Sequence, residues 1–140
     1  MPKADIDLIL KKIKFLRDDL NHLKKFKNIS LAEYMEDDLK RASIERFLEK
    51  ITGRVIDINY HILREEYEIL PEDYYSSFVE LGKKGVIPAK IASELARSTG
   101  LRNALAHEYD KIDDKKVYQS IKLAISEVPE YLKRILKFLS

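Results

Sequence analysis

Apolar residues recur every three to four positions along most of the chain, and this period restricts the fold more than any other feature of the sequence. It is the period of an α-helix with one buried face. Only four glycines and four prolines interrupt the 140 residues, so long helices can form without breaks. No segment shows the apolar–polar alternation of a half-buried strand. The sequence therefore predicts an all-α protein.

Helix-start and helix-stop signals divide the chain into four to five main helices joined by short connections. Ser30 and Glu33 form a capping-box signature, and the Leu70–Pro71 step disfavours helical backbone. The predicted helices cover Asp5–Phe26, a stretch that starts at Ser30, about Glu36–Glu66, Pro71–Gly82, Ala89 to about Ala106, and a last helix that follows an aspartate cap in Lys111–Asp114 and ends at Leu139. We expect a single domain over residues 1–140, folded as an antiparallel up-and-down helical bundle.

The charges nearly balance, since 26 Lys and Arg against 24 Asp and Glu give a net charge of +2. So small an excess does not bind nucleic acid through bulk charge, and such binding needs a local patch or a cleft made by assembly. The chain has no cysteine, which excludes disulfides, thiolate nucleophiles and thiolate metal sites. No apolar run approaches the roughly 20 residues of a membrane span. We expect a cytoplasmic protein that does not bind membranes.

The familiar metal, phosphate-loop and serine-hydrolase motifs are absent, so the three histidines become the first candidates for chemistry. His22 lies near the end of the first predicted helix, where the helix dipole favours a surface histidine. Asp57 and His61 stand four residues apart and share one helix face. They form either a local carboxylate–imidazole pair or a support for a functional cleft. Two such ligands do not make a metal site, and we expect neither a metal nor a cofactor.

The segment from Gly100 to Tyr109 holds the residues best suited to phosphodiester chemistry. Arg102 offers a fixed guanidinium fork to phosphate oxygens, His107 can move a proton near neutral pH, and Tyr109 adds a hydroxyl. On one continuous helix Arg102 and His107 would point about 140° apart. If the backbone is extended after Ala106, His107 and Tyr109 would face the same side. Spacing alone is a weak motif, because a helix-end salt bridge and a satisfied histidine would explain it equally well.

The wider string resembles the HepT branch of the HEPN (higher eukaryotes and prokaryotes nucleotide-binding) domains. The matching segments are Gly100-Leu101-Arg102-Asn103, His107-x-Tyr109, Ile112-Asp113 with Val117, Asp57-Ile58-x-x-His61-Ile62, and Tyr74–Phe78 followed by Leu81, Gly85, Val86 and Ile87. The resemblance extends from about Asp38 to Ile125 and keeps order and spacing throughout. In that context the Arg-x₄-His-x-Tyr string is specific.

The resemblance implies an all-α bundle that forms a homodimer, in which the motifs of two protomers line one cleft. It implies a metal-independent endoribonuclease that acts on RNA as the toxin of a toxin–antitoxin pair. The residues expected at the site are Arg102 and His107 in catalysis, with Asn103, Asp57 and His61 in substrate binding or support. The implied partner is MntA, a small nucleotidyltransferase-fold antitoxin that adenylylates the tyrosine of the motif, here Tyr109.

Two alternatives remain open. The chain could be a non-catalytic HEPN-like module that binds a nucleotide or a nucleotidyltransferase, with Arg102 and Tyr109 as recognition residues. It could also be an antitoxin-like or adaptor bundle, in which the string from Gly100 to Tyr109 has arisen by chance.

Basic clusters and one aromatic cluster are suited either to RNA contacts or to the fold. The basic clusters are Lys11-Lys12-x-Lys14, Lys24-Lys25-x-Lys27, Lys83-Lys84 and Lys115-Lys116. Such runs are more often solvated helix faces than substrate contacts. Tyr74, Tyr75 and Phe78 could stack on bases, but their helical spacing favours a place in the core or an interface.

Overall fold

The computed structural model describes residues 4–100 and 113–140, and all regular secondary structure in these ranges is α-helical. The helices are α1 (Ile6–Lys24), α2 (Leu31–Glu36), α3 (Asp38–Tyr67), α4 (Tyr74–Lys83), α5 (Ala89–Ala96) and α7 (Asp114–Leu139). The predicted all-α class is confirmed. The six described helices correspond one to one to the six helical stretches predicted, and the stretch that starts at Ser30 is the short α2, which exceeds the count of four to five main helices. None of the described helices combines the length and the apolar character needed to cross a membrane.

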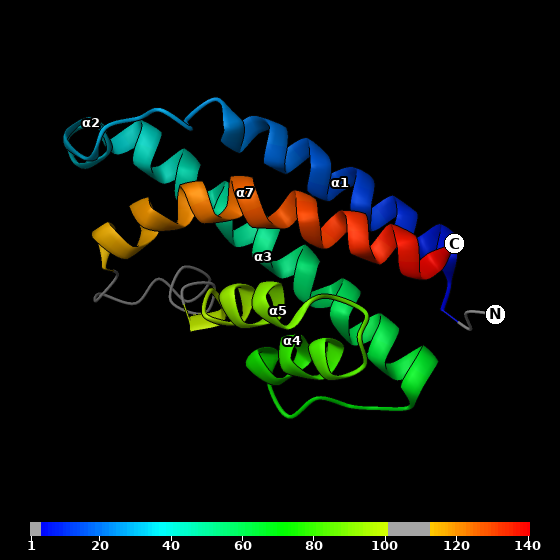
Figure 1. Ribbon diagram of the computed structural model, residues 1–140. Coiled ribbons are helices and arrows are strands. Elements are labelled where there is room, and N and C mark those ends of the chain that lie inside the picture. Colours follow the sequence, from blue (N-terminus) through cyan, green and yellow to red (C-terminus); the bar gives the residue numbers. More distant parts are fainter. Residues whose placement is uncertain (1–3, 101–112) are drawn as a thin grey trace.

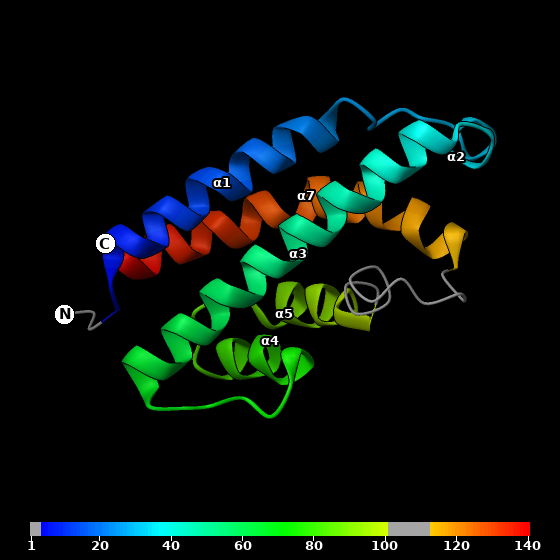
Figure 2. The same cartoon turned by 180° about the vertical axis from the view of Figure 1, so that it is seen from behind.

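The long helices α1, α3 and α7 form the body of the molecule, and α4 and α5 pack beside it as a helical hairpin (Figures 1 and 2). α1 runs antiparallel to both α3 and α7. The loop 68–73 returns along the edge of the molecule before α4 begins, so the helix directions do not alternate strictly from α3 to α4. The apolar stripes of the long helices meet in one core, whose buried members include Ile13, Leu16, Ile58, Ile62 and Ile135.

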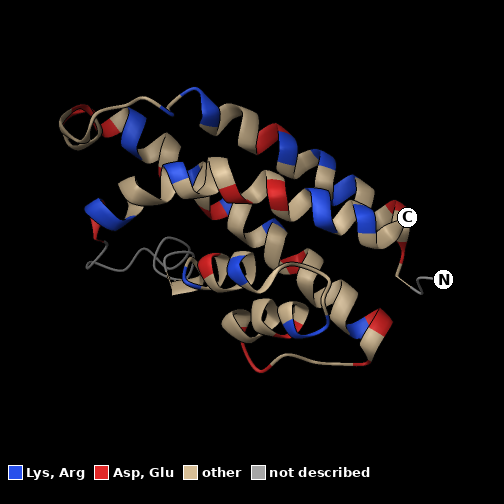
Figure 3. Ribbon diagram, viewed as in Figure 1, with Lys and Arg blue, Asp and Glu red and all other residues tan. Residues whose placement is uncertain are grey.

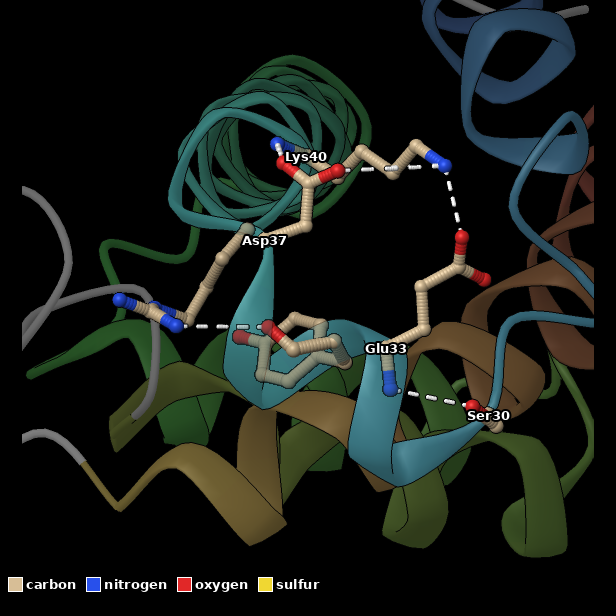
Figure 4. A network of polar contacts seen from close by, with 6 residues as sticks. Ser30, Glu33, Asp37 and Lys40 are labelled. Carbon is tan, nitrogen blue, oxygen red and sulfur yellow. Dashed lines mark hydrogen bonds and ion pairs between the residues drawn. The ribbon is translucent and has the colours of Figure 1, made fainter.

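A sharp break at Asp37 separates α2 from α3 (Figure 4). Ser30 starts α2, because its Oγ accepts a hydrogen bond from the Glu33 N–H at 3.0 Å. Asp37 is extended, ends α2, and caps α3 by accepting a hydrogen bond from the Lys40 N–H at 3.0 Å. The Lys40 ammonium also reaches the Glu33 carboxylate at 2.7 Å and so bridges the two helices. The predicted helix start at Ser30 is confirmed, and the long helix begins two residues later than predicted.

The long helix α3 ends through a left-handed residue. Glu68 has φ 55°, and the Ile69 N–H turns back to donate to the Leu63 carbonyl at 3.0 Å. This geometry satisfies carbonyls that the last turn would otherwise leave without donors. The predicted end near Glu66 is therefore correct to within one or two residues.

Helix α4 begins three residues later than predicted. Pro71 and the residue after it precede the helix, and Asp73 is its N-cap, with a carboxylate that accepts a hydrogen bond from the Ser76 N–H at 2.8 Å. Gly82 and Gly85 were predicted to end this helix: Gly82 lies in its last turn, and Gly85, with φ 74°, follows its end. A Cβ at Gly82 would lie 3.0 Å from the Cβ of Ala92. The missing side chain therefore permits the close approach of α4 and α5.

Helix α5 is shorter than the predicted helix from Ala89 to Ala106. It ends at Ala96, and the next two residues form a turn. The Ser98 hydroxyl donates to the Leu95 carbonyl at 2.6 Å, and the Thr99 hydroxyl donates to the Ala96 carbonyl at 2.9 Å. Because side-chain hydroxyls satisfy these carbonyls locally, they offer the backbone an alternative to continued helix. The prediction of one unbroken helix is wrong at this turn.

Candidate functional site

The predicted catalytic residues Arg102 and His107, together with Asn103 and Tyr109, lie outside the described residues. The structure does describe the helices on either side of this segment, α5 before it and α7 after it. These two helices, and the residues that hold them in place, therefore form the described surroundings of the predicted site.

The start of α7 is fixed against α2 by two tyrosines. The Tyr118 hydroxyl donates to the Ile29 carbonyl at 2.7 Å. Its ring lies 5.7 Å from the ring of Tyr34, a fully buried residue. Asp113 caps α7 by accepting a hydrogen bond from the Lys115 N–H at 3.1 Å, which confirms the predicted aspartate cap. Asp113, the first described residue after the motif segment, is thus held in a defined position.

An ionisable cluster lies beside the first turn of α7. Burial, and then the charge of Asp114, raise the pKa of the partly buried Glu45 carboxyl. Burial also raises the pKa of the Tyr34 phenol, with smaller contributions from Glu45 and Asp114. The Tyr34 hydroxyl has no hydrogen-bond partner among the described residues. It therefore stays protonated at neutral pH and is a packing group rather than a base.

A small cavity between α3, α5 and α7 borders the same region. Its volume is about 20 Å³, and aliphatic side chains such as Leu48 and Val128 make up most of its wall. Ser98 and Ser120 add hydroxyls to the lining. This volume suits about one water molecule, so the cavity cannot hold a nucleotide.

Asp57 and His61 have separate partners, and the predicted carboxylate–imidazole pair is wrong. The Asp57 side chain is 64% exposed and lies 3.9 Å from the Lys12 ammonium of α1. His61 is buried, and its Nε2 accepts a hydrogen bond from the Asp5 N–H at 3.0 Å. Both contacts anchor α1 to α3, and a role of these residues in the site stays a prediction.

Within residues 4–100 and 113–140, no group of three His, Asp or Glu side chains is placed to hold a metal ion. His22 is exposed, as expected for the last turn of α1, and its ring stacks on Phe47 at 5.1 Å. The aromatic cluster serves mainly the fold: Phe78 is fully buried, Tyr74 packs edge-on against Tyr60, and Tyr75 is half-exposed. Among the described basic clusters, Lys83 pairs with Glu80 at 3.8 Å.

Two polar arrangements were missed by the sequence analysis. Asn59, Ser77 and Tyr131 form a buried network that joins α3, α4 and α7. Glu94 of α5 lies beside Glu127 of α7, and burial, followed by the interaction with Glu94, raises the pKa of the Glu127 carboxyl. A polar residue inside an apolar stripe, such as Asn59, is a sign in the sequence of a buried polar contact. The sequence does not indicate which residues on other helices are the partners in that contact.

Comparison with known proteins gives one family and several similar chains. The family model described as Ribonuclease HepT-like matches residues 16–135. A protein of Aphanizomenon flos-aquae (strain 2012/KM1/D3) named tRNA nuclease HepT is 41% identical over 120 residues, or 86% of this chain and 82% of that protein. The mRNA nuclease HepT of Shewanella oneidensis is 23% identical over 107 residues, or 76% of this chain and 80% of that protein.

Solved structures show the same fold at lower identity. YutE from Bacillus subtilis, a cytosolic protein of unknown function, superposes with a TM-score of 0.85 at 19% identity and covers 99% of this chain and 93% of its own. A tri-AMPylated Shewanella oneidensis HEPN toxin in complex with MNT antitoxin gives a TM-score of 0.83 at 21% identity, over 94% of this chain and 98% of its own. The described helices are thus arranged as in these proteins.

Proposed function

The chain belongs to the HepT-like ribonuclease family, and we propose that it is an endoribonuclease toxin whose antitoxin is an MntA-type nucleotidyltransferase. The observation that carries the proposal is the 41% identity to a tRNA nuclease along 86% of the chain. The family match over residues 16–135 spans the string from Gly100 to Tyr109. Likeness to a toxin–antitoxin complex in fold supports the same assignment.

Arg102 and His107 are the proposed catalytic residues. The RNA 2′-hydroxyl attacks the neighbouring phosphorus and the 5′-oxygen leaves, which yields a 2′,3′-cyclic phosphate and a 5′-hydroxyl. His107 takes the proton from the attacking hydroxyl or gives one to the leaving oxygen. Arg102 stabilises the negative charge that develops on the phosphoryl oxygens, and Asn103 orients the phosphate. We propose that this route needs no metal ion, because the nucleophile belongs to the substrate.

Replacement of His107 by alanine tests this assignment. We expect His107→Ala to abolish RNA cleavage in the presence of a chelator, because the variant lacks the imidazole that is proposed to move the proton. Helicity by circular dichroism should be unchanged. The matched control is His22→Ala, which removes an exposed histidine stacked on Phe47 and should leave cleavage intact. Full cleavage by the His107 variant would refute the assignment, and intact RNA with the natural chain would favour a non-catalytic binding module.

Tyr109 is the proposed point of control. The partner transfers AMP from ATP to the Tyr109 oxygen: a bond forms from that oxygen to the α-phosphorus, the α–β anhydride breaks, and pyrophosphate leaves with the phenolic proton going to solvent. The attached AMP places a negative charge and a bulky adenosine where an RNA phosphate must enter. Like-charge repulsion and occlusion then both oppose substrate binding.

Mass spectrometry after co-expression with the nucleotidyltransferase tests this control. We expect AMP on Tyr109, and no modification of Tyr109→Phe, which should still cut RNA. The control is Tyr75→Phe, which removes the hydroxyl of a tyrosine that is 50% exposed and should leave the modification in place. AMP mapped to another tyrosine, or a modified chain that cuts at full rate, would contradict the proposal.

A further inference from the structure

Helices α1 and α7 lie side by side and antiparallel (Figure 1). Side chains of these two helices line a basic groove between them. Its volume is about 200 Å³. The residues that line it are Arg17, Leu20, Asn21 and Lys24 of α1 and Pro129 and Leu132 of α7. Among the described residues no carboxylate belongs to this lining, although the chain as a whole carries 24 acidic residues.

Further cations extend the groove along both helices. The helical period places Lys14 on the same face of α1 as Arg17, and it places Lys122 and Lys133 on the face of α7 that carries Pro129. These lysines, and the two cations of the lining, are exposed. Figure 3 shows the basic positions on both helices.

The cations of the α1–α7 groove form no ion pair in the described structure, whereas two cations of α3 that face α1 are neutralised. Toward α3, Arg54 contacts the Asp19 carboxylate at 2.9 Å, and Lys50 contacts the same carboxylate at 3.2 Å. No ion pair joins any cation of the α1–α7 groove to another described residue. The neighbouring carboxylates Asp18 and Glu130 lie about 100° round their helices from Arg17 and Pro129 respectively, and nearer to Lys14 and Lys133, but neither forms an ion pair with these lysines in the described structure. Unneutralised charge therefore gathers on one groove of a nearly neutral chain.

The lining suits a phosphodiester backbone better than a protein surface. Among its apolar members, Leu20 and Leu132 are each 3% exposed and Pro129 is partly exposed, so the described lining holds no aromatic side chain of the kind that anchors protein interfaces. Arg17 and Lys24 stand about 10 Å apart along α1, a span that successive phosphates of one strand can follow. Asn21 lies between them and can donate a hydrogen bond to a phosphate or sugar oxygen.

We propose that the α1–α7 groove binds the RNA backbone of the substrate and positions it for cleavage elsewhere on the molecule. This inference rests on the proposed ribonuclease function, which supplies the polyanionic substrate that the groove would bind. The groove supplies sequence-independent affinity through release of counterions. It acts on substrate binding and leaves the chemical step unchanged.

The test compares two triple variants of equal charge change. The groove triple is Arg17→Gln, Lys24→Gln and Lys133→Gln. The control triple is Lys11→Gln, Arg64→Gln and Arg134→Gln, which neutralises exposed cations on other faces. Binding of fluorescently labelled total tRNA is measured over a range of salt concentrations, with each triple in the full chain that also carries His107→Ala to prevent cleavage. Circular dichroism verifies that all variants are folded.

We expect the groove triple to bind at least about tenfold more weakly at low salt. The slope of log Kobs against log salt concentration should fall by about 2, since each phosphate contact contributes about 0.7 to 0.9. The control triple should keep the affinity and the salt dependence of the natural chain. With His107 restored, the groove triple should raise KM and leave kcat unchanged.

Equal losses in both triples, or no loss in either, would overturn the proposal. A groove triple that loses binding to the purified nucleotidyltransferase but keeps its RNA affinity would overturn it in favour of a protein-binding surface. A chain that shows the expected binding differences yet never cleaves RNA would leave the groove standing and refute the ribonuclease. The two proposals therefore fail in different ways.

Discussion

At the scale of single residues, Asn59 forms the central hydrogen bonds of a polar network in the described core. Its side-chain oxygen accepts a hydrogen bond from the Tyr131 hydroxyl at 2.6 Å, and its amide donates to the Ser77 hydroxyl at 3.1 Å. Ser77 donates onward to the Tyr74 carbonyl at 2.7 Å. Asn59, Ser77 and Tyr131 are completely buried. A buried polar group that loses its partner bears its full desolvation cost, so the network fixes how α3, α4 and α7 meet.

Removal of one hydroxyl tests that interpretation. Tyr131→Phe keeps the ring but deprives the Asn59 oxygen of its donor, since the single hydroxyl proton of Tyr131 makes its shorter contact there, 2.6 Å against 3.3 Å to the Val55 carbonyl. We expect a loss of about 1–3 kcal/mol in the free energy of unfolding, measured by urea denaturation. The control Tyr75→Phe removes an exposed hydroxyl and should change stability by no more than about 0.5 kcal/mol. Equal stability of the two variants would show that the network contributes nothing.

At the scale of elements, the contact between α5 and α7 is sensitive to pH. Glu127 faces Glu94, Lys90 and Glu130, and burial is the main cause that raises its pKa. The Oε2 atom of Glu127 is buried without a hydrogen-bond partner among the described residues. The folded chain holds the proton of the Glu127 carboxyl more tightly than the unfolded chain does. The resulting contribution to the free energy of unfolding is therefore fully present at pH values below the ordinary glutamate pKa. It is lost as the pH rises through the raised pKa.

Glu127→Gln should remove this dependence. A glutamine amide can donate to the Glu94 carboxylate at every pH at which the chain is folded. We expect the urea midpoint of the variant to exceed that of the natural chain at pH 7 and to match it near pH 4. Glu72→Gln, in the exposed loop before α4, should shift neither midpoint. A variant that is less stable than the natural chain at pH 7 would contradict this account.

The helices themselves were largely predictable from the sequence, because apolar period and caps are local signals. Asp113 and Ser30 act at the ends where they were expected. The errors arise where a side chain competes with the backbone: Asp73 caps α4 instead of entering it, and Ser98 closes α5 early. Both residue types favour caps and turns over helix interiors, but sequence alone does not tell which of the two roles each residue takes.

For the candidate site, too, one part was predictable from the sequence and another part was not. The string from Arg102 to Tyr109 was found through its resemblance to a family, and that family is confirmed by the match over residues 16–135. The predicted pairing of Asp57 with His61 failed because tertiary partners intervened: Lys12 and the Asp5 N–H come from α1 and its cap. A four-residue spacing indicates which side chains can meet on one helix. It does not indicate which groups of a second helix will contact those side chains.

At the scale of the whole molecule, charge and assembly are linked. A net charge of +2 gives a single chain little long-range attraction for RNA. The unpaired cations of the α1–α7 groove concentrate charge locally on each copy. A homodimer would double that surface and would bring two Arg102 side chains to one cleft, so that an almost neutral chain could hold a polyanion.

We therefore predict that the active form is a dimer. Light scattering during gel filtration should give a mass of twice 16.4 kDa, both for the natural chain and for His107→Ala, since the histidine acts in chemistry and not in assembly. Specific RNA-cleaving activity should fall on dilution in parallel with the loss of the dimer, because a protomer alone presents half of the cleft. Activity per chain that stays constant from the dimeric into the fully monomeric range would refute the shared cleft, since each chain would then cut RNA unaided.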